Sequence, residues 1–133
     1  MTTATRREQR ERSLELLYEA EAKGVAVARV VDDLPVPPDA WVAELVIAVE
    51  EAAGALDEVI GRHAIGWAVD RMPVVDRTLL RIATFELLHR PEVPTGAAIA
   101  EAVELAKTFS TEESGRFVNG VLAAVAAEAR PGS

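Results

Sequence analysis

Residues 99–122 read I-A-E-A-V-E-L-A-K-T-F-S-T-E-E-S-G-R-F-V-N-G-V-L, and two amphipathic patterns meet within this stretch. In each half the apolar residues recur at steps of three and four, which places them on one face of a helix. Between the halves, Ser110 and Glu113 have the spacing of a capping box, in which the hydroxyl and the carboxylate satisfy free N–H groups at a helix start. The stretch therefore predicts a helical hairpin whose second helix is capped by Ser110.

Two glycines, Gly115 and Gly120, lie inside the second of these helices. Each costs about 1 kcal/mol of helix propensity relative to alanine. We expect the close approach of another backbone to offset that cost, so the hairpin is predicted to pack tightly.

The N-terminal part of the chain shows the same helical spacing. Thr5 can cap a helix that runs to about residue 23, with Gly24 as its stop. A shorter helix is expected within 25–34, before a proline-rich connection. Asp39 can then cap a helix of about twenty residues that reaches residue 60.

The central part of the chain predicts one long helix that opens after R-M-P (71–73), with Asp76 as a possible cap and an apolar surface from Leu79 to Leu88. This helix is apolar around much of its circumference, which is typical of the central helix of a bundle. Pro91 and Pro94 end it and lead into the hairpin of residues 99–122. Because no alternating apolar run indicates a strand, the sequence predicts an all-α fold.

Composition and charge limit the possible function. The chain has 133 residues, a length that fits one domain, and it has no cysteine, which excludes disulfides, thiolate metal sites and cysteine nucleophiles. No apolar run approaches the ~20 residues that span a bilayer, and no signal peptide is evident, so a cytoplasmic protein without a membrane partner is expected. The net charge of −8 argues against RNA binding over the whole surface, but not at a local basic patch.

Such a patch is present at the head of the first predicted helix. Four arginines face two glutamates there, and the cations oppose the helix dipole, which prefers negative groups at an N-terminus. One interpretation is a solvated face with i,i+4 ion pairs. The other is a functional role for the positive charge. The residues concerned are Arg6, Arg7, Arg10 and Arg12, with Glu8 and Glu11.

No constellation of catalytic or metal-binding residues stands out. His63 and His89 lack partners at ligand spacing, and no glycine-rich phosphate loop or nucleophile elbow is present. We therefore expect no catalytic residues, no metal, no cofactor and no enzymatic activity.

Three segments of the sequence carry a family resemblance. The first is W-A-V-D-R-M-P-V-V-D-R (67–77), continuing as L-L-R-I-A-T-F-E-L (79–87). The second joins Pro94 to I-A-E-A-V-E-L-A-K (99–107) and F-V-N-G-V-L (117–122), and the third is the arginine-rich head followed by Leu17 and Tyr18. Together they resemble the NusB family of bacterial transcription antitermination factors over essentially the whole chain.

The resemblance implies a fold and a function. The fold is a single NusB-like RNA-binding domain over residues 1–133, with about seven helices in two packed subbundles and with 1–4 and 130–133 disordered. The function is to bind single-stranded boxA RNA of ribosomal RNA transcripts together with a ribosomal protein called NusE, as part of an antitermination complex on RNA polymerase.

The resemblance also implies site residues. Glu8, Gln9 and Arg12 dilute the basic head, so weak RNA affinity without the partner is expected. Tyr18 matches a position shared by the RNA and protein surfaces, and Glu86 matches an acidic position at the interface with the ribosomal protein. The residues matching RNA-binding positions are Arg6, Arg7, Arg10, Tyr18, Phe117 and Asn119.

Two other interpretations stay open. Some RNA cytosine methyltransferases carry a domain of this fold, but a chain that ends at Ser133 leaves no room for a methyltransferase domain. Alternatively, the apolar helix around 79–88 could pair with a second copy of itself and form a homodimer that masks the RNA surface.

Overall fold

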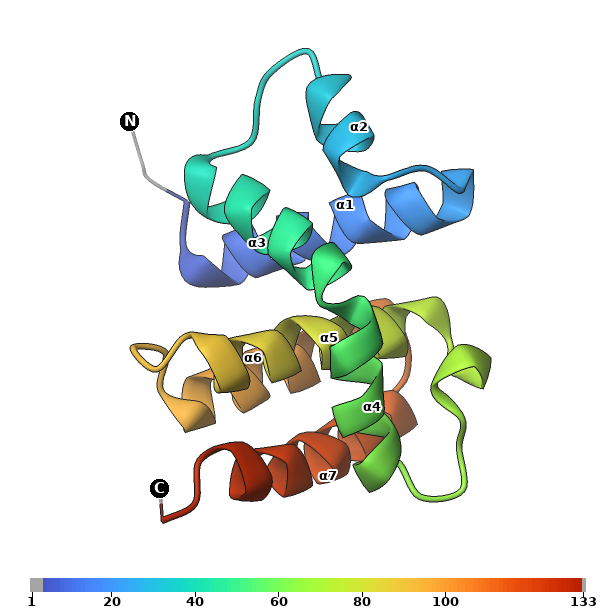
Figure 1. Ribbon diagram of the computed structural model, residues 1–133, viewed down its shortest axis with the longest axis vertical. Coiled ribbons are helices and arrows are strands. Elements are labelled where there is room, and N and C mark those ends of the chain that lie inside the picture. Colours follow the sequence, from blue (N-terminus) through green and yellow to red (C-terminus); the bar gives the residue numbers. More distant parts are fainter. Residues whose placement is uncertain (1–3, 133) are drawn as a thin grey trace. The chain divides into compact units, whose positions relative to one another are not determined.

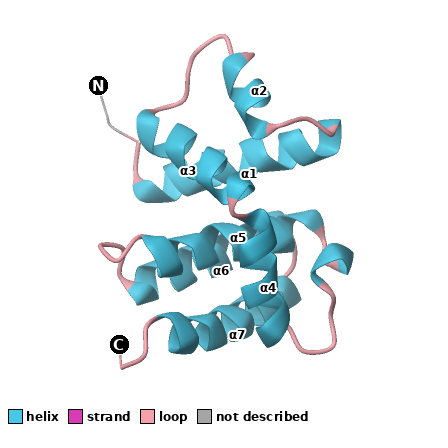
Figure 2. Ribbon diagram, in the orientation of Figure 1, coloured by secondary structure: helices cyan, strands magenta, loops and turns pink. Residues whose placement is uncertain are grey.

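The computed structural model describes residues 4–132, which form seven α-helices and one short 3-10 helix and contain no strand (Figure 2). The prediction of an all-α fold of about seven helices is confirmed. None of the helices in this described part of the chain is long and apolar enough to cross a membrane. In chain order the elements are α1 (Arg6–Lys23), α2 (Val27–Asp32), α3 (Ala40–Glu51), α4 (Ala53–His63), η1 (Val69–Arg71), α5 (Val74–His89), α6 (Thr95–Phe109) and α7 (Glu112–Ala129).

The chain divides into two compact units, the first ending at Glu51 and the second beginning at Ala52. Helices α1, α2 and α3 contact one another in the first unit, and α4 to α7 form the second. The helices are labelled in Figure 1. The division agrees with the predicted two subbundles.

The first unit is closed by a small aliphatic core. Helix α1 begins as predicted, with Thr5 as N-cap, and it ends at Gly24, whose φ of 66° is left-handed and therefore favours glycine. The Gly24 N–H bonds the carbonyls at the end of α1, so the chain turns back into α2. The core residues are Leu16, Ala20, Val27, Val30, Val42 and Val46.

The expectation of one helix from Asp39 to residue 60 is wrong. Asp39 does cap α3, since its Oδ1 accepts from the Val42 N–H at 2.9 Å, but the helix breaks at Ala52, where φ is −90° and ψ is 1°. The apolar stripe of α3 is buried with α1 and α2, whereas that of α4 is buried with α5 and α7. An uninterrupted apolar pattern thus spans a junction between units.

Helix α5 is the centre of the second unit, because it contacts α4, α6 and α7. Its apolar face is therefore used within the chain, and Leu88 is the member of that face that stays exposed, at 37%. The apolar residues through which the homodimer alternative would pair are thus covered within the chain. The buried apolar residues are Leu79, Leu80, Ile82, Ala83 and Leu87.

The α6–α7 hairpin forms as predicted, with two corrections. The N-cap of α7 is Thr111, whose hydroxyl accepts from the Ser114 N–H at 3.0 Å, while Ser110 ends α6. Gly115 is buried, and a Cβ there would lie 2.7 Å from the Cγ of Lys107, so the close neighbour is a side chain of α6. A Cβ at Gly120 would meet nothing within 4 Å, and close packing does not explain that glycine.

The C-terminal end is held more firmly than the sequence indicates. Disorder was expected from residue 130 on, yet α7 continues to Ala129 and Arg130 is tied into the second unit. Its guanidinium donates to four backbone carbonyls, those of Glu86, Leu87, Arg90 and Val93, at 2.6 to 3.1 Å, and to the Thr95 hydroxyl at 3.0 Å. Arg130 thereby satisfies free carbonyls at the end of α5. Residues 1–3 and 133 lie outside the described part of the chain.

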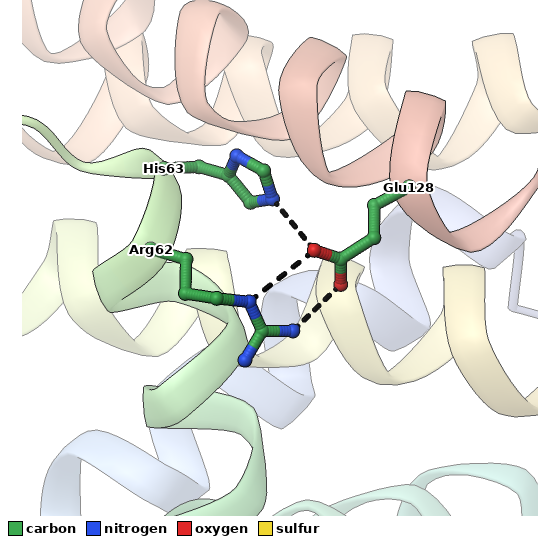
Figure 3. A network of polar contacts seen from close by, with 3 residues as sticks. All are labelled: Arg62, His63 and Glu128. Atoms are coloured by element: carbon green, nitrogen blue, oxygen red, sulfur yellow. Dashed lines mark hydrogen bonds and ion pairs between the residues drawn. The ribbon is translucent and has the colours of Figure 1, made fainter.

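A second side-chain link joins the end of α4 to the end of α7. The Glu128 carboxylate accepts two hydrogen bonds from Arg62, at 2.7 and 3.3 Å, and contacts the His63 Nε2 at 3.1 Å (Figure 3). The pKa of the Glu128 carboxyl lies below its usual value because Arg62, and then His63, hydrogen-bond the charged form.

Replacing Arg130 tests the first of these links. We expect Arg130→Met to lower the free energy of unfolding by about 2 kcal/mol, because half-buried carbonyls lose a charged donor. Urea denaturation followed by circular dichroism measures the change. Arg116→Met, at an exposed position of α7, is the matched control. Equal unfolding midpoints for the two variants would contradict the role of Arg130.

The Glu128 link makes a small contribution to stability that depends on pH. Its carboxyl has a lower pKa folded than unfolded, so the contribution is present above the usual value of 4.5 and is lost as the pH falls through the folded pKa. Wild type should melt at a higher temperature than Glu128→Gln at pH 7, and this difference in melting temperature should shrink as the pH falls below 4.5 and through the folded pKa. Glu44→Gln, which removes an exposed charge from α3, should show no such difference across this pH range.

Candidate nucleic-acid interface

The start of α1 is fixed by a reciprocal capping box. The Thr5 hydroxyl accepts from the Glu8 N–H, and the Thr5 N–H donates to the Glu8 carboxylate, each at 3.1 Å. The backbone hydrogen bond lowers the pKa of Glu8, so this acid stays charged in the first turn, where the helix dipole favours it. Arg6 and Arg7 are therefore held at a defined helix end.

Two of the predicted arginines, Arg6 and Arg10, lie over the ring of Trp41 in α3. The guanidinium carbon of Arg6 lies 4.6 Å from the ring centroid and that of Arg10 lies 5.6 Å from it. Both distances are within the range of a cation–π interaction, which offsets the repulsion between two like charges one turn apart.

A hydrogen-bond chain runs beside this ring. The Arg6 guanidinium donates to the side-chain oxygen of Gln9, whose amide nitrogen donates in turn to Asp39 Oδ2 at 3.0 Å. Asp39 also caps α3, and both hydrogen bonds, that of Gln9 first, hold the pKa of its carboxyl below the usual value. We call Arg6, Gln9, Arg10, Asp39 and Trp41 the arginine–tryptophan cluster.

The three predicted arginines differ in exposure. Arg6 and Arg7 are exposed, whereas Arg10 is only 5% exposed. Arg10 therefore does not present its charge to solvent, because its guanidinium is covered and lies by Trp41. Exposed guanidinium groups can bind phosphates and stack on unpaired bases, which is the chemistry of single-stranded RNA binding.

Tyr18 lies further along the same helix and is 47% exposed. It follows Arg7 by eleven residues, or about three turns, so the two face nearly the same side of α1, roughly 16 Å apart along its axis. A base or a partner side chain can reach the ring of Tyr18.

Phe117 and Asn119 belong to α7, in the second unit. Phe117 is half-buried, with its ring centroid 4.9 Å from that of Trp67, while Asn119 is exposed. Residues two apart on a helix point about 200° apart, so these two side chains face different directions. The structure does not bring Phe117 and Asn119 onto one surface.

Glu86 does not lie on a surface at all. Its side chain is fully buried, with 0% exposure, within the wide buried face of α5. The expectation that Glu86 presents an acidic group to a protein partner is therefore wrong for the chain as it stands. The second unit does have exposed carboxylates, for example those of Glu112 and Glu113 in the first turn of α7.

Sequence reasoning missed three members of the cluster. The sequence predicted Asp39 only as a cap and Gln9 as a dilution of the basic head, and no motif singled out Trp41. A separation of about thirty residues between α1 and α3 gives no spacing signal that would join them. The only hint was the unfavourable charge at a helix start, which requires some compensating neighbour.

The sequence model of the NusB family matches residues 7–127 of this chain. A transcription antitermination protein NusB from Thermobifida fusca is 46% identical over 122 residues, which cover 89% of this chain and 86% of that protein. Both matches extend over most of the chain.

Solved structures give the same result. T. maritima NusB superposes with a TM-score of 0.85 at 32% identity, over 98% of this chain and 96% of that chain. A crystal structure of the antitermination factors NusB and NusE in complex with double-stranded RNA contains a chain with a TM-score of 0.79 at 25% identity, over 92% of this chain and 96% of that one.

The unequal exposure of the arginines predicts unequal effects on stability. We expect Arg10→Met to lower the free energy of unfolding by about 1 kcal/mol, since the Trp41 ring loses the covered cation that packs on it. Arg7→Met, at an exposed position one turn earlier, should leave it unchanged within about 0.5 kcal/mol. Chemical denaturation of both variants measures this. Arg10 would be an ordinary surface residue if both variants unfolded like wild type.

Proposed function

Because the chain belongs to the NusB family, we propose that it is a transcription antitermination factor that binds boxA RNA of ribosomal RNA transcripts together with the ribosomal protein NusE. In this role it forms part of an antitermination complex on RNA polymerase. The observation that carries the proposal is the pair of exposed arginines, Arg6 and Arg7, held by a capping box at the start of α1.

The chemistry of this site suits single-stranded RNA. Guanidinium groups bind phosphate oxygens in pairs and also stack on bases, and both contacts tolerate an irregular strand. Tyr18 adds an exposed aromatic ring on nearly the same side as Arg7. We assign phosphate contacts to Arg6 and Arg7, and a contact with a base or with NusE to Tyr18.

The remaining predicted residues take lesser roles in this proposal. Arg10 supports Trp41 and Arg6 from a covered position, and Asn119 is an exposed polar group that can contact RNA independently of Phe117. The acidic surface of the chain favours a basic partner, as ribosomal proteins commonly are. The protein acts by binding and not by catalysis, in the cytoplasm where bacterial transcripts are made.

Removal of the two exposed charges tests the proposal. In the Arg6→Gln/Arg7→Gln double variant, affinity for a boxA RNA oligonucleotide should fall at least tenfold. The slope of log affinity against log salt should become flatter by about 1.4, because each phosphate contact on a single strand contributes roughly 0.7. Fluorescence anisotropy at several salt concentrations, with NusE present, measures both quantities.

Arg29→Gln is the matched control, because it removes one exposed cation from α2 in the same unit. It should leave affinity and slope near wild type, and circular dichroism should show unchanged helix content for every variant. If the double variant binds boxA RNA as tightly as wild type at each salt concentration, the site is elsewhere. If wild type does not distinguish boxA from a scrambled RNA even with NusE, the proposed function is wrong.

A further inference from the structure

We propose that Trp41 is a positioning residue for RNA binding, which holds the guanidinium of Arg6 where an RNA phosphate meets it. This inference rests on the proposed function. Trp41 belongs to α3, and neither the family resemblance nor the charge pattern of the chain points to it. It would act through Arg6 without contacting RNA itself.

The geometry separates Arg6 from its neighbour. Arg6 lies 4.6 Å from the Trp41 centroid and hydrogen-bonds Gln9, so two contacts on different elements restrain one exposed side chain. Arg7 is the next residue along, about 100° further around the helix, and is also exposed. Two cations of equal charge thus stand side by side, and the aromatic ring lies beside Arg6.

Arg10 is the second arginine that packs on the Trp41 ring. The Arg10 guanidinium lies 5.6 Å from the Trp41 centroid, and the side chain is nearly buried. Arg10 therefore contacts the ring but is not available to a ligand. The Gln9–Asp39 hydrogen bond ties the same turn of α1 to the start of α3. The ring is therefore fixed relative to the helix that carries Arg6.

Fixing an arginine matters because its side chain has many rotamers. An unrestrained arginine loses that freedom when it binds a phosphate, whereas a restrained one has already lost it. Loss of the ring should therefore weaken RNA binding without changing the number of phosphates that are neutralised. The salt slope separates this effect from the loss of a charge.

A double-mutant cycle tests the inference. Trp41→Leu should weaken binding of boxA RNA, with NusE present, by about threefold to fivefold, with the salt slope of wild type. In an Arg6→Gln background the same substitution should have almost no further effect. In an Arg7→Gln background it should have its full effect. Trp41→Phe, which keeps an aromatic ring, should recover most of the affinity.

Three outcomes separate the possibilities. Equal weakening by Trp41→Leu in the Arg6→Gln and Arg7→Gln backgrounds would mean that Trp41 only supports the fold, and the inference is overturned alone. Absence of boxA binding by wild type, with or without NusE, overturns the proposed function and the inference with it. Should Trp41→Leu not fold, the cycle is run with Trp41→Phe, whose smaller partial loss must likewise disappear in the Arg6→Gln background.

Discussion

The starts of α1 and α3 depend on one shared arrangement, in which the Trp41 ring receives two cations while Asp39 accepts a hydrogen bond from Gln9. Each helix start has a cap of its own, Thr5 for α1 and Asp39 for α3, but the arginines still oppose the dipole of α1. The two helix starts stabilise each other, because the Trp41 face stabilises the cations of α1 and the Asp39 carboxylate, which caps α3, also binds Gln9 of α1. The surface that we assign to RNA is thus a consequence of how two helix starts are stabilised.

In the second unit, side chains stabilise the C-terminal ends of helices. From beyond the end of α7, Arg130 donates to two carbonyls in the last turn of α5 and to three acceptors in the residues that follow α5. Arg62 and His63, at the end of α4, bind Glu128 in the same region of α7. Polar side chains thus link the ends of α4, α5 and α7 around a core of leucine, isoleucine and smaller aliphatic residues.

Many local features of the fold could be predicted from the sequence, and long-range ones could not. Two predicted caps are wrong, because α7 is capped by Thr111 and not Ser110, and Asp76 lies buried inside α5, which begins after Pro73. The Thr5 cap, the Gly24 stop and the Asp39 cap follow from side-chain chemistry within three or four residues, and all three are present. The break at Ala52 was missed because the apolar pattern continues through it. The burial of Glu86 and the pairing of Arg6 with Trp41 were missed because charge and periodicity do not say which elements meet. The resemblance correctly gave the family, but residue matching carried no information about exposure.

The acidity of the chain affects how its arginine-rich head can bind RNA. With a net charge of −8, the chain as a whole repels RNA, so on the proposed function the electrostatic attraction comes from local basic groups such as the head of α1. Two phosphate contacts change the affinity by less than about tenfold between 50 and 200 mM salt. Such an interface is too small to hold arbitrary RNA firmly, and repulsion by the remaining surface disfavours it further. On the proposed function, discrimination then arises from the additional contacts of a bound partner, and an acidic protein with a small basic head is suited to a site that is complete only in the complex.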